Sequence, residues 1–214
     1  EKVSGLRYAE RMPDAVFTTA SGVHAIPLAE FAAMAMLMHS RRALHMVSEQ
    51  AGRRWRRFSG TDLALRTVVV VGLGAVGSEV ARVAKALHMR VLGVRRDPSK
   101  PSDGLHVDAV YGVDALSGLL PEADFLILIA PHTAETEGMI GAAELALLPR
   151  GAVLINIARG ALVDEAALIA SLEAGHLGGF YADVFAQEPL AATSPLWSMP
   201  NVLIDAHSAS VSDR

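Results

Sequence analysis

The stretch VVVVGLGAVG at residues 68–77 decides the fold. Its four valines predict a buried β-strand, and residues 75–88 place apolar side chains along one helical face. The glycines form the pattern G-x-G-x-x-G at the junction. In a strand-to-helix turn of this type, Gly72 permits the tight bend, Gly74 lets a pyrophosphate approach the backbone, and Gly77 lets the helix pack close to the strand. The stretch therefore predicts the phosphate-binding turn of a dinucleotide site.

The residues after this turn bear on which dinucleotide is bound. Ala75 and Val76 open the predicted helix, whose free N–H groups attract phosphate. NAD-dependent folds place an acidic residue about 20 residues beyond the glycines, at the end of the second strand. That position falls among Arg95, Arg96 and Asp97. Asp97 there would favour NAD, whereas either arginine would favour the 2′-phosphate of NADP. The expected strand length places the arginines there, so we expect NADP and keep NAD as the alternative.

Beyond the turn, short apolar runs alternate with helical patterns. The sequence predicts strands at residues 67–71, 90–94, 125–129, 153–157, 179–184 and 202–204, and helices at 75–88, 114–119, 142–148 and 165–173. Strands that are almost continuously apolar and separated by helices indicate a parallel sheet covered on both faces. We therefore expect an α/β fold with a doubly wound parallel sheet, a Rossmann-type dinucleotide-binding domain.

The segment ahead of the sheet has a different character. Residues 1–28 carry turn signals and are expected to be irregular, and a single helix is expected over 29–48. Its apolar residues surround it almost completely, which predicts burial on most sides and a place at an interface. The methionines that could pack across a homodimer interface are Met34, Met36, Met38 and Met46. The RRWRR cluster at 53–57 allows an RNA-binding interpretation, but we interpret it as a solvated connector anchored by Trp55.

Composition limits the possible functions. The 214 residues carry a formal net charge of −4, which gives no general reason to bind nucleic acid, and contain no cysteine. Disulfides, thiolate metal sites and a cysteine nucleophile are thus excluded, and no metal is expected. The apolar stretch at 31–38 is shorter than the roughly 20 residues that span a bilayer. We expect a cytoplasmic protein without a membrane partner.

Three later segments carry ionisable side chains directly after predicted strands. These are NIARG at 156–160 with Arg159, DVFAQEP at 183–189 with Glu188, and DAH at 205–207 with His207. Ligands of open α/β sheets bind at the carboxyl ends of the strands, so the three side chains could share one crevice. A guanidinium can pair with the carboxylate of a 2-oxo acid and polarise its carbonyl. An imidazole can exchange a proton with the carbonyl oxygen as hydride moves, and a nearby carboxylate favours the protonated imidazole.

The chain resembles the D-isomer-specific 2-hydroxyacid dehydrogenase family from about residue 20 to its end. The matching motifs, in family-like order and spacing, are GVHAIPLAE at 22–30, the 72–77 turn, LPRGAVLINIARG at 148–160, the 183–189 segment, and PLWSMPNV at 195–202 running into His207. The resemblance implies an NAD(P)-dependent oxidoreductase that interconverts small 2-oxo acids and D-2-hydroxy acids, similar to glyoxylate/hydroxypyruvate reductases. It also implies that Arg159 binds substrate, that His207 is the general acid/base, and that Glu188 is its partner.

The resemblance further implies cofactor contacts. Asp183 would bond the nicotinamide carboxamide in a pocket lined by Ala158, and Pro131 and Thr136 are expected on the adenosine side. The sequence departs from the family at Ala206, where proline commonly precedes the catalytic histidine. This departure leaves the catalytic roles in place but weakens any subfamily assignment.

Family members also have a smaller substrate domain, which is expected to be missing or truncated here. We expect residues 1–28 to lead out of that domain, 29–207 to form the dinucleotide-binding domain with its interface helix, and 208–214 to begin the return. Domain closure helps to exclude water, so the fragment alone is expected to be weak or inactive. By the same resemblance, we expect a homodimer formed around residues 29–48.

Two other functions remain open from the sequence. Some relatives of this fold are corepressors that sense NAD(H) and recruit proteins, and these can keep the same three side chains. Formate-dehydrogenase-like enzymes share the fold but use glutamine where Glu188 stands. The presence of Arg159, Glu188 and His207 together favours an enzyme acting on a 2-hydroxy acid.

Overall fold

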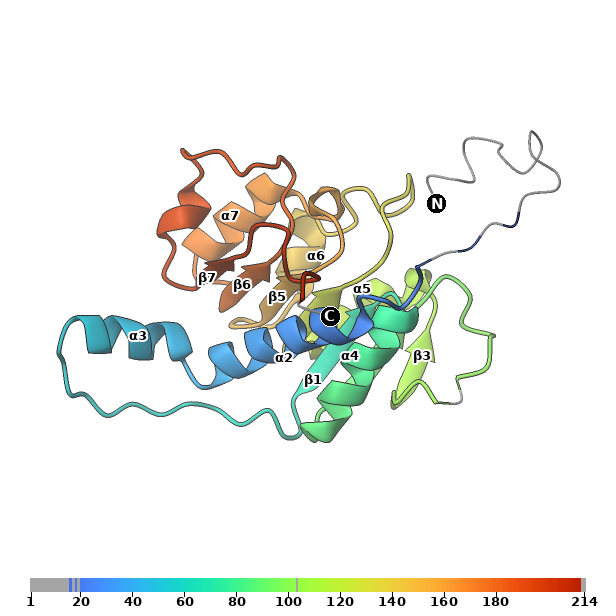
Figure 1. Cartoon of the computed structure of the whole chain (residues 1–214), viewed down its shortest axis with the longest axis horizontal. Helices are drawn as coiled ribbons and strands as arrows, with labels where there is room; N and C mark the ends of the chain where they lie inside the picture. Colours follow the sequence, from blue (N-terminus) through green and yellow to red (C-terminus); the bar gives the residue numbers. More distant parts are fainter. Residues whose placement is uncertain (1–15, 17, 19, 103, 213–214) are drawn as a thin grey trace.

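The computed structural model describes residues 16, 18, 20–102 and 104–212. At its centre lies a seven-stranded parallel sheet in the order β3-β2-β1-β4-β5-β6-β7 (Figure 1). The strands are β1 (Thr67–Val71), β2 (Arg90–Val94), β3 (Ala109–Tyr111), β4 (Phe125–Leu128), β5 (Val153–Asn156), β6 (Gly179–Ala182) and β7 (Val202–Ile204). The doubly wound parallel sheet predicted from the sequence is confirmed.

The strand order changes direction at β1. This strand pairs with β2 on one side and β4 on the other, so that Val71 lies opposite both Val94 and Leu128. The sheet grows one way to β3 and the other way to β7. At such a switch point the loops at the carboxyl ends of the strands diverge, which creates the crevice where ligands of this fold bind. Gly72 follows β1 directly, so the glycine turn lies at this crevice.

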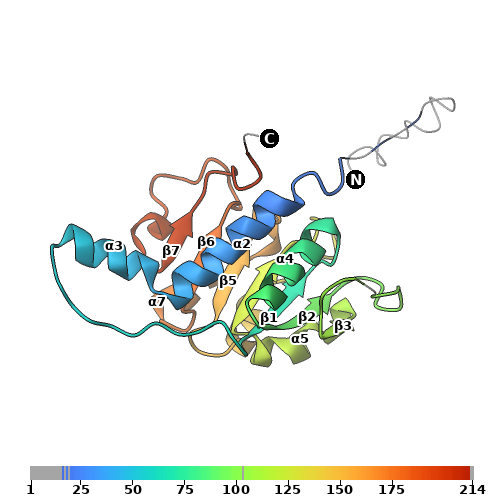
Figure 2. The same cartoon turned by 60° about the horizontal axis from the view of Figure 1, so that its bottom comes forward.

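Helices cover both faces of the sheet. One face carries α2 (Ala25–Ser40) and α4 (Ala75–Ala86), and the other carries α5 (Leu116–Leu119), α6 (Ala142–Leu147) and α7 (Glu165–Glu173). Figure 2 shows α2 and α4 side by side in front of the strands. All five residues of β1 are buried, because the strand packs under helices on both sides. This burial explains why the strand is a continuous run of apolar residues rather than an alternating one.

The prediction of a single helix over residues 29–48 is wrong. The structure has two helices, α2 and α3 (Ala43–Ala51), separated at Arg41 and Arg42. Arg42 adopts the left-handed region with φ of 56°, which ends the helical path. Its guanidinium lies 5.4 Å from the ring centroid of Phe58, a cation–π distance that helps to hold the bend.

Within this chain, the predicted burial is seen on one face of α2, and burial of the opposite face at an interface stays a prediction. Ala32 and Met36 are fully buried in the core beneath α2. On the opposite side, Met34 and Leu37 are 39% and 41% exposed. The sequence of α2 is apolar nearly all round, but only one face of the helix packs against this chain. The other face is an exposed apolar surface.

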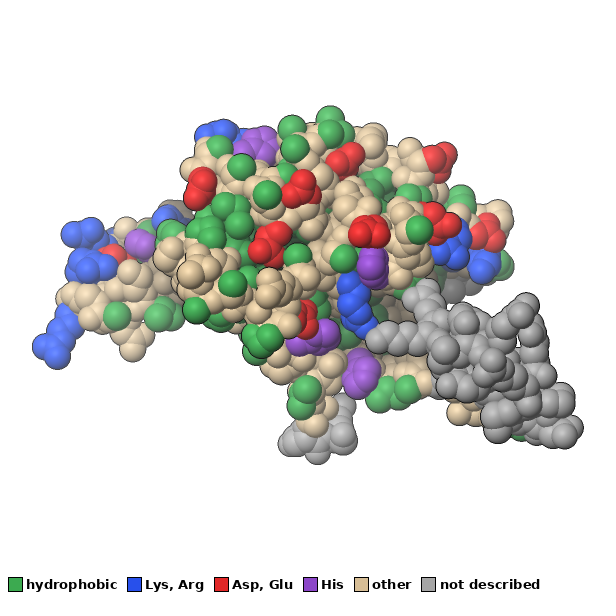
Figure 3. All heavy atoms as spheres, turned by 90° about the horizontal axis from the view of Figure 1, so that it is seen from above, with side chains coloured by type: hydrophobic (Ala, Val, Ile, Leu, Met, Phe, Trp, Pro, Cys, Tyr) green, Lys and Arg blue, Asp and Glu red, His purple; other side chains and the backbone are tan. Residues whose placement is uncertain are grey.

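An arm made of α3 and residues 52–62 projects from the body of the molecule, at the left of Figure 1. Residues 52–62 form neither helix nor strand. Trp55 is 99% exposed, so the expectation that it anchors this segment is wrong. Contacts that tie the segment back include a hydrogen bond of 3.0 Å from Arg54 Nε to Oε1 of the largely buried Glu49 and one of 2.8 Å from the Thr61 N–H to the Ser40 carbonyl. Basic side chains gather at this end of the molecule in Figure 3.

The bounds of the other predicted elements differ from the observed ones by at most two residues. The exception is β3, which was not predicted; it is a three-residue edge strand that pairs with β2. The 3₁₀ turns are η2 (Val113–Ala115), η3 (Leu120–Glu122), η4 (Gly160–Leu162) and η5 (Pro195–Ser198). Among the residues described, none of the helices has the length and apolar character needed to cross a membrane.

Candidate functional site

The glycine turn is as closely packed as the motif predicts. Gly72 has φ of +110°, and a Cβ on it would lie 2.7 Å from the backbone nitrogen of Ala130. A Cβ on Gly77 would lie 1.9 Å from the carbonyl oxygen of Gly72. The Gly72 N–H donates to the Val94 carbonyl over 2.8 Å, which joins the turn to the end of β2. Any larger residue at position 72 or 77 would collide with backbone, which a flexible side chain cannot relieve.

Gly74, in contrast, faces open space. It is the N-cap of α4 in an extended conformation, and no described atom lies within 4 Å of a Cβ built on it. The first N–H groups of α4 have no partners within the helix and carry the positive end of its dipole. Free N–H groups beside an open space fit a pyrophosphate, so the turn is suited to a dinucleotide.

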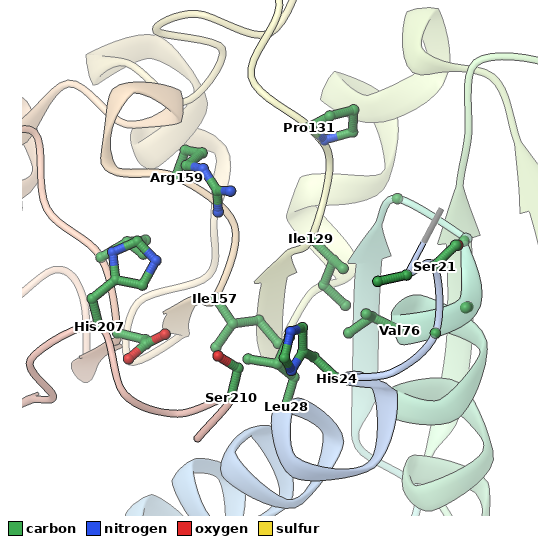
Figure 4. A pocket seen from close by; sticks show the side chains of 17 residues that line it. Ser21, His24, Leu28, Val76, Ile129, Pro131, Ile157, Arg159, His207 and Ser210 are labelled. Carbon is green, nitrogen blue, oxygen red and sulfur yellow. The ribbon is translucent and has the colours of Figure 1, made fainter. Parts of the chain in front are cut away.

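A cavity of about 550 Å³ extends from this turn to the ends of β5 and β6 (Figure 4). In this view the guanidinium of Arg159 and the ring of His207 lie on one side, and Val76 lies on the other. The predicted site residues that line the cavity are Gly72, Gly74, Ala75, Val76, Pro131, Arg159, Asp183 and His207. The structure thus brings the predicted phosphate-binding turn together with two of the three predicted catalytic side chains.

The third, Glu188, contacts His207 directly. The Nδ1 atom of His207 lies 2.7 Å from Glu188 Oε2, and Glu188 Oε1 accepts a hydrogen bond of 3.0 Å from the Phe185 N–H. Partial burial acts to raise the pKa of Glu188, but the hydrogen bonds from His207 and Phe185 and the nearby positive charges outweigh it and lower that pKa. The pair uses Nδ1 of the imidazole and leaves Nε2, on the other side of the ring, for a substrate.

Arg159 is placed by a turn that follows β5. The buried Asn156 donates from Nδ2 to the Arg159 carbonyl over 3.0 Å and accepts from the Ala158 N–H over 3.1 Å. The next residue, Gly160, lets this turn touch the loop after β6, because a Cβ on it would lie 1.9 Å from the carbonyl carbon of Phe185. The loops that carry the arginine and the glutamate are therefore packed against each other.

Asp183 is a buried carboxylate at the end of β6. Its side chain lines the cavity although the residue is 3% exposed, and its Oδ1 accepts from the Ala209 N–H over 2.9 Å. Burial raises the pKa of Asp183, and the negative charge of Asp205 acts in the same direction. The backbone hydrogen bonds lower this pKa but do not reverse the shift. A buried acceptor at this edge is suited to bind an N–H donor of a ligand.

The remaining predicted residues do not line the cavity. Gly77 and Ala158 are buried beneath its wall. Thr136 lies in the loop that follows Pro131, and its Oγ1 donates to the Pro131 carbonyl over 2.7 Å. The threonine therefore supports the loop that borders the cavity.

Arg95 and Arg96 follow β2 beside the glycine turn, as the strand length predicted. Arg95 folds back onto the next loop and donates to the carbonyls of Lys100 and, over 3.3 Å, Pro101. The exposed Arg96 pairs with Glu135 over 3.4 Å. Neither guanidinium lines the cavity, although both lie at the end of the second strand.

Sequence reasoning missed a group of cavity residues. These are Ala20, Ser21, Gly22 and His24 just before α2 and Leu28 in its first turn, together with Ile129, Ile157, Val184 and Ser210. The motif at 22–30 signalled family resemblance but carried no pattern that assigns it to a ligand site. The packing of α2 against α4 brings this segment to the glycine turn, and no local sequence signal encodes that contact.

Fold and site together define a dinucleotide-binding α/β domain with a histidine–carboxylate pair at its cavity. Residues 33–209 match the family described as D-isomer specific 2-hydroxyacid dehydrogenase, NAD binding domain. The chain belongs to this family, which confirms the resemblance seen in its motifs.

Curated relatives with similar sequences carry several activities. A glyoxylate reductase of Thermococcus gammatolerans is 36% identical over 212 residues, which cover 95% of this chain and 60% of that protein. A D-3-phosphoglycerate dehydrogenase of Synechocystis is 39% identical over 190 residues, which cover 89% of this chain and 33% of that protein. The chain thus spans from a third to about 60% of the length of these relatives.

Solved structures agree with the fold. A D-isomer specific 2-hydroxyacid dehydrogenase of Xanthobacter autotrophicus, in complex with NADPH and MES, has a TM-score of 0.82 and 38% identity, over 90% of this chain and 60% of that one. An NADPH-dependent glyoxylate/hydroxypyruvate reductase of Sinorhizobium meliloti, in complex with NADP and sulfate, has a TM-score of 0.82 and 33% identity, over 92% of this chain and 62% of that one.

Proposed function

We propose that this chain is the dinucleotide-binding part of an NAD(P)-dependent dehydrogenase that interconverts a small 2-oxo acid, of glyoxylate or hydroxypyruvate size, and its D-2-hydroxy acid. One observation carries the proposal: the His207 ring, hydrogen-bonded to Glu188 over 2.7 Å, lines the same cavity as Arg159 and the glycine turn. The names of the glyoxylate reductase relatives support the substrate class.

His207 acts as the general acid and base in this proposal. During reduction its Nε2–H gives a proton to the carbonyl oxygen of the oxo acid, and during oxidation Nε2 takes the proton back. Glu188 holds the ring through Nδ1 and stabilises its protonated form. The nicotinamide dinucleotide, when bound, supplies or accepts the hydride.

Arg159 binds the substrate. Its guanidinium points into the cavity on the same side as His207 (Figure 4), where it can form a forked, charge-assisted pair with the carboxylate of a 2-oxo acid. Asp183 is buried at the cavity wall and can accept from the carboxamide N–H of the nicotinamide. Its burial restricts it to a positioning role, whereas Arg159 remains exposed to incoming substrate.

NADP is the proposed cofactor. Arg95 and Arg96 stand where β2 ends, next to the turn that accepts the pyrophosphate, and two basic side chains there favour a 2′-phosphate. Several similar structures were solved with NADPH or NADP bound.

The test is a titration of the intact protein with NADPH and NADH, followed by steady-state reduction of glyoxylate, hydroxypyruvate and larger oxo acids. We expect tighter binding of NADPH and turnover of the small oxo acids. His207→Gln should bind NADPH normally and lose turnover by about 10²- to 10⁴-fold, the usual contribution of a general acid. An intact protein that binds NADPH but reduces none of these acids would contradict the proposed activity.

We also propose that the protein is a homodimer that uses the arm and the exposed face of α2. Met34 and Leu37 on α2 and Met46 and Val47 on α3 are exposed apolar side chains, 39–63% accessible, on adjoining helices. Size-exclusion chromatography with light scattering should give twice the monomer mass at micromolar concentration. A stable monomer under these conditions would contradict the dimer.

A further inference from the structure

We propose that Asp205 is a positioning residue that clamps the backbone around His207 in its catalytic orientation. The inference deepens the proposed function and rests on it. Asp205 follows β7, and its own N–H donates to the Ala182 carbonyl over 2.8 Å, which anchors it to β6. Its Oδ1 accepts two hydrogen bonds, one of 2.8 Å from the Ala206 N–H and one of 2.6 Å from the Ser208 hydroxyl.

These two donors stand on either side of His207. The histidine has φ of 56°, in the left-handed region that non-glycine residues adopt only where their surroundings hold them. One carboxylate oxygen therefore gathers the residue before the histidine and the residue after it into a closed turn. In this turn Nδ1 reaches Glu188 over 2.7 Å, so the clamp on the backbone and the hydrogen bond on the ring fix the same side chain.

Ala206 is what makes the clamp possible. A proline at this position would have no N–H to donate and would fix its own φ instead. In this chain the residue before the histidine is free to donate, and the neighbouring carboxylate accepts. The restraint that a proline ring would supply through covalent geometry is here supplied by a hydrogen bond.

Asp183 supports the same turn from the other end. Its Oδ1 accepts from the Ala209 N–H over 2.9 Å. Because Asp183 also lines the cavity, its substitution would change ligand binding and positioning together. Asp205 is not among the residues that line this cavity, so its substitution separates the two effects.

The experiment compares Asp205→Ala, Asp205→Asn and Ser208→Ala in the intact protein. Asparagine keeps an oxygen that can accept both hydrogen bonds, whereas alanine removes the acceptor and Ser208→Ala removes one donor. We expect Asp205→Ala to lower kcat about tenfold, because a misplaced catalytic group loses its near-attack geometry. Asp205→Asn should stay within about twofold of the wild type, and Ser208→Ala should fall between them, with the affinity for NADPH unchanged in all three.

A readout independent of turnover is the ¹⁵N chemical shift of His207 Nδ1, which reports its hydrogen bond to Glu188. This signal should move toward that of an unpaired imidazole in Asp205→Ala and stay in place in Asp205→Asn. If Asp205→Ala does not fold, the Ser208→Ala and Asp205→Asn pair gives the same contrast. The clamp would be overturned if Asp205→Ala left both kcat and the ¹⁵N shift unchanged. It would also be overturned if Asp205→Ala and Asp205→Asn lowered kcat equally. A wild type that reduces no oxo acid overturns the proposed function instead, and the ¹⁵N comparison still decides the role of Asp205.

Discussion

The Nδ1 atom of His207 lies 2.7 Å from Oε2 of Glu188, although the two residues are 19 positions apart and follow different strands. The sheet makes this contact possible, because β6 and β7 are neighbours and their carboxyl ends lie at one edge. Glu188 is held by the Phe185 N–H on its other oxygen, so the carboxylate has a fixed orientation before any ligand arrives.

Glu188→Gln is expected to weaken turnover more at neutral pH than at pH values below the lowered pKa of Glu188. The lowered pKa of Glu188 means that the carboxylate stays ionised as the pH falls through the ordinary glutamate range. Its stabilising contribution is present above that range and is lost as the pH falls through the lowered pKa. Glutamine cannot stabilise a protonated imidazole by charge, so kcat should fall by about tenfold to a hundredfold. The measurement is kcat/KM against pH for both proteins; superimposable profiles would show that the carboxylate has no such role.

Gly74→Ala and Gly77→Ala form a matched pair at the glycine turn. A Cβ at position 77 meets the Gly72 carbonyl at 1.9 Å, so Gly77→Ala should lose about 3 kcal/mol of stability, the upper range for overpacking. For a chain of this size that corresponds to roughly 6–12 °C in Tm. A Cβ at position 74 meets no described atom, so Gly74→Ala should keep its Tm and weaken NADPH binding by obstructing the pyrophosphate. Calorimetry and fluorescence titration separate the two effects, and a large loss of Tm in Gly74→Ala would contradict this view of the turn.

Arg96→Ala tests the choice of dinucleotide. A hydrogen bond to a charged group contributes about 1.5–3 kcal/mol, so the Kd for NADPH should rise by about tenfold to a hundredfold. The Kd for NADH should change less than twofold, because it lacks the phosphate. Arg90→Ala is the control, since Arg90 lies at the opposite end of β2 and pairs with Glu122. Equal weakening of NADPH and NADH binding would argue against a 2′-phosphate site at position 96.

Asp183→Asn is expected to raise the stability of the ligand-free protein at neutral pH. Burial raises the pKa of Asp183, so the folded state disfavours its charge. A raised carboxyl pKa gives a contribution that is favourable at low pH and is lost as the pH rises from the unfolded value through the folded one. The Tm advantage of the asparagine variant should therefore grow over this window and vanish below it. Thermal melts between pH 3 and pH 8 measure it, at about one-unit steps; a lower Tm for the variant at neutral pH would show that the charged form is favoured.

Much of the fold could be predicted because the signals are local. Within ten residues, the valines of β1 predict the strand, and the three glycines after it predict the turn and the class of ligand that it binds. Arg159, Glu188 and His207 could be placed on one edge because each follows a strand, and parallel strands end together.

Other features depend on contacts that no local pattern records. The apolar residues at 29–48 look like one helix, and only the left-handed Arg42 with the Phe58 ring beneath its guanidinium shows the break. The edge strand β3 has only three residues, which is too few to show the alternation of apolar and polar side chains that identifies a strand. The two hydrogen bonds from the turn around His207 to Asp205 require its folded shape, and the sequence DAHS suggests no more than a polar loop.

The arm determines where the folded protein is open to proteolysis. Residues 53–57 place four arginines in an exposed segment without helix or strand, which is what trypsin requires. A single nick there would leave α2 attached to the sheet through its packing against α4, and both fragments would remain together. If a second copy covers the arm, the rate of this nick falls as protein concentration rises, so a timed digest reports assembly from a few micrograms of sample.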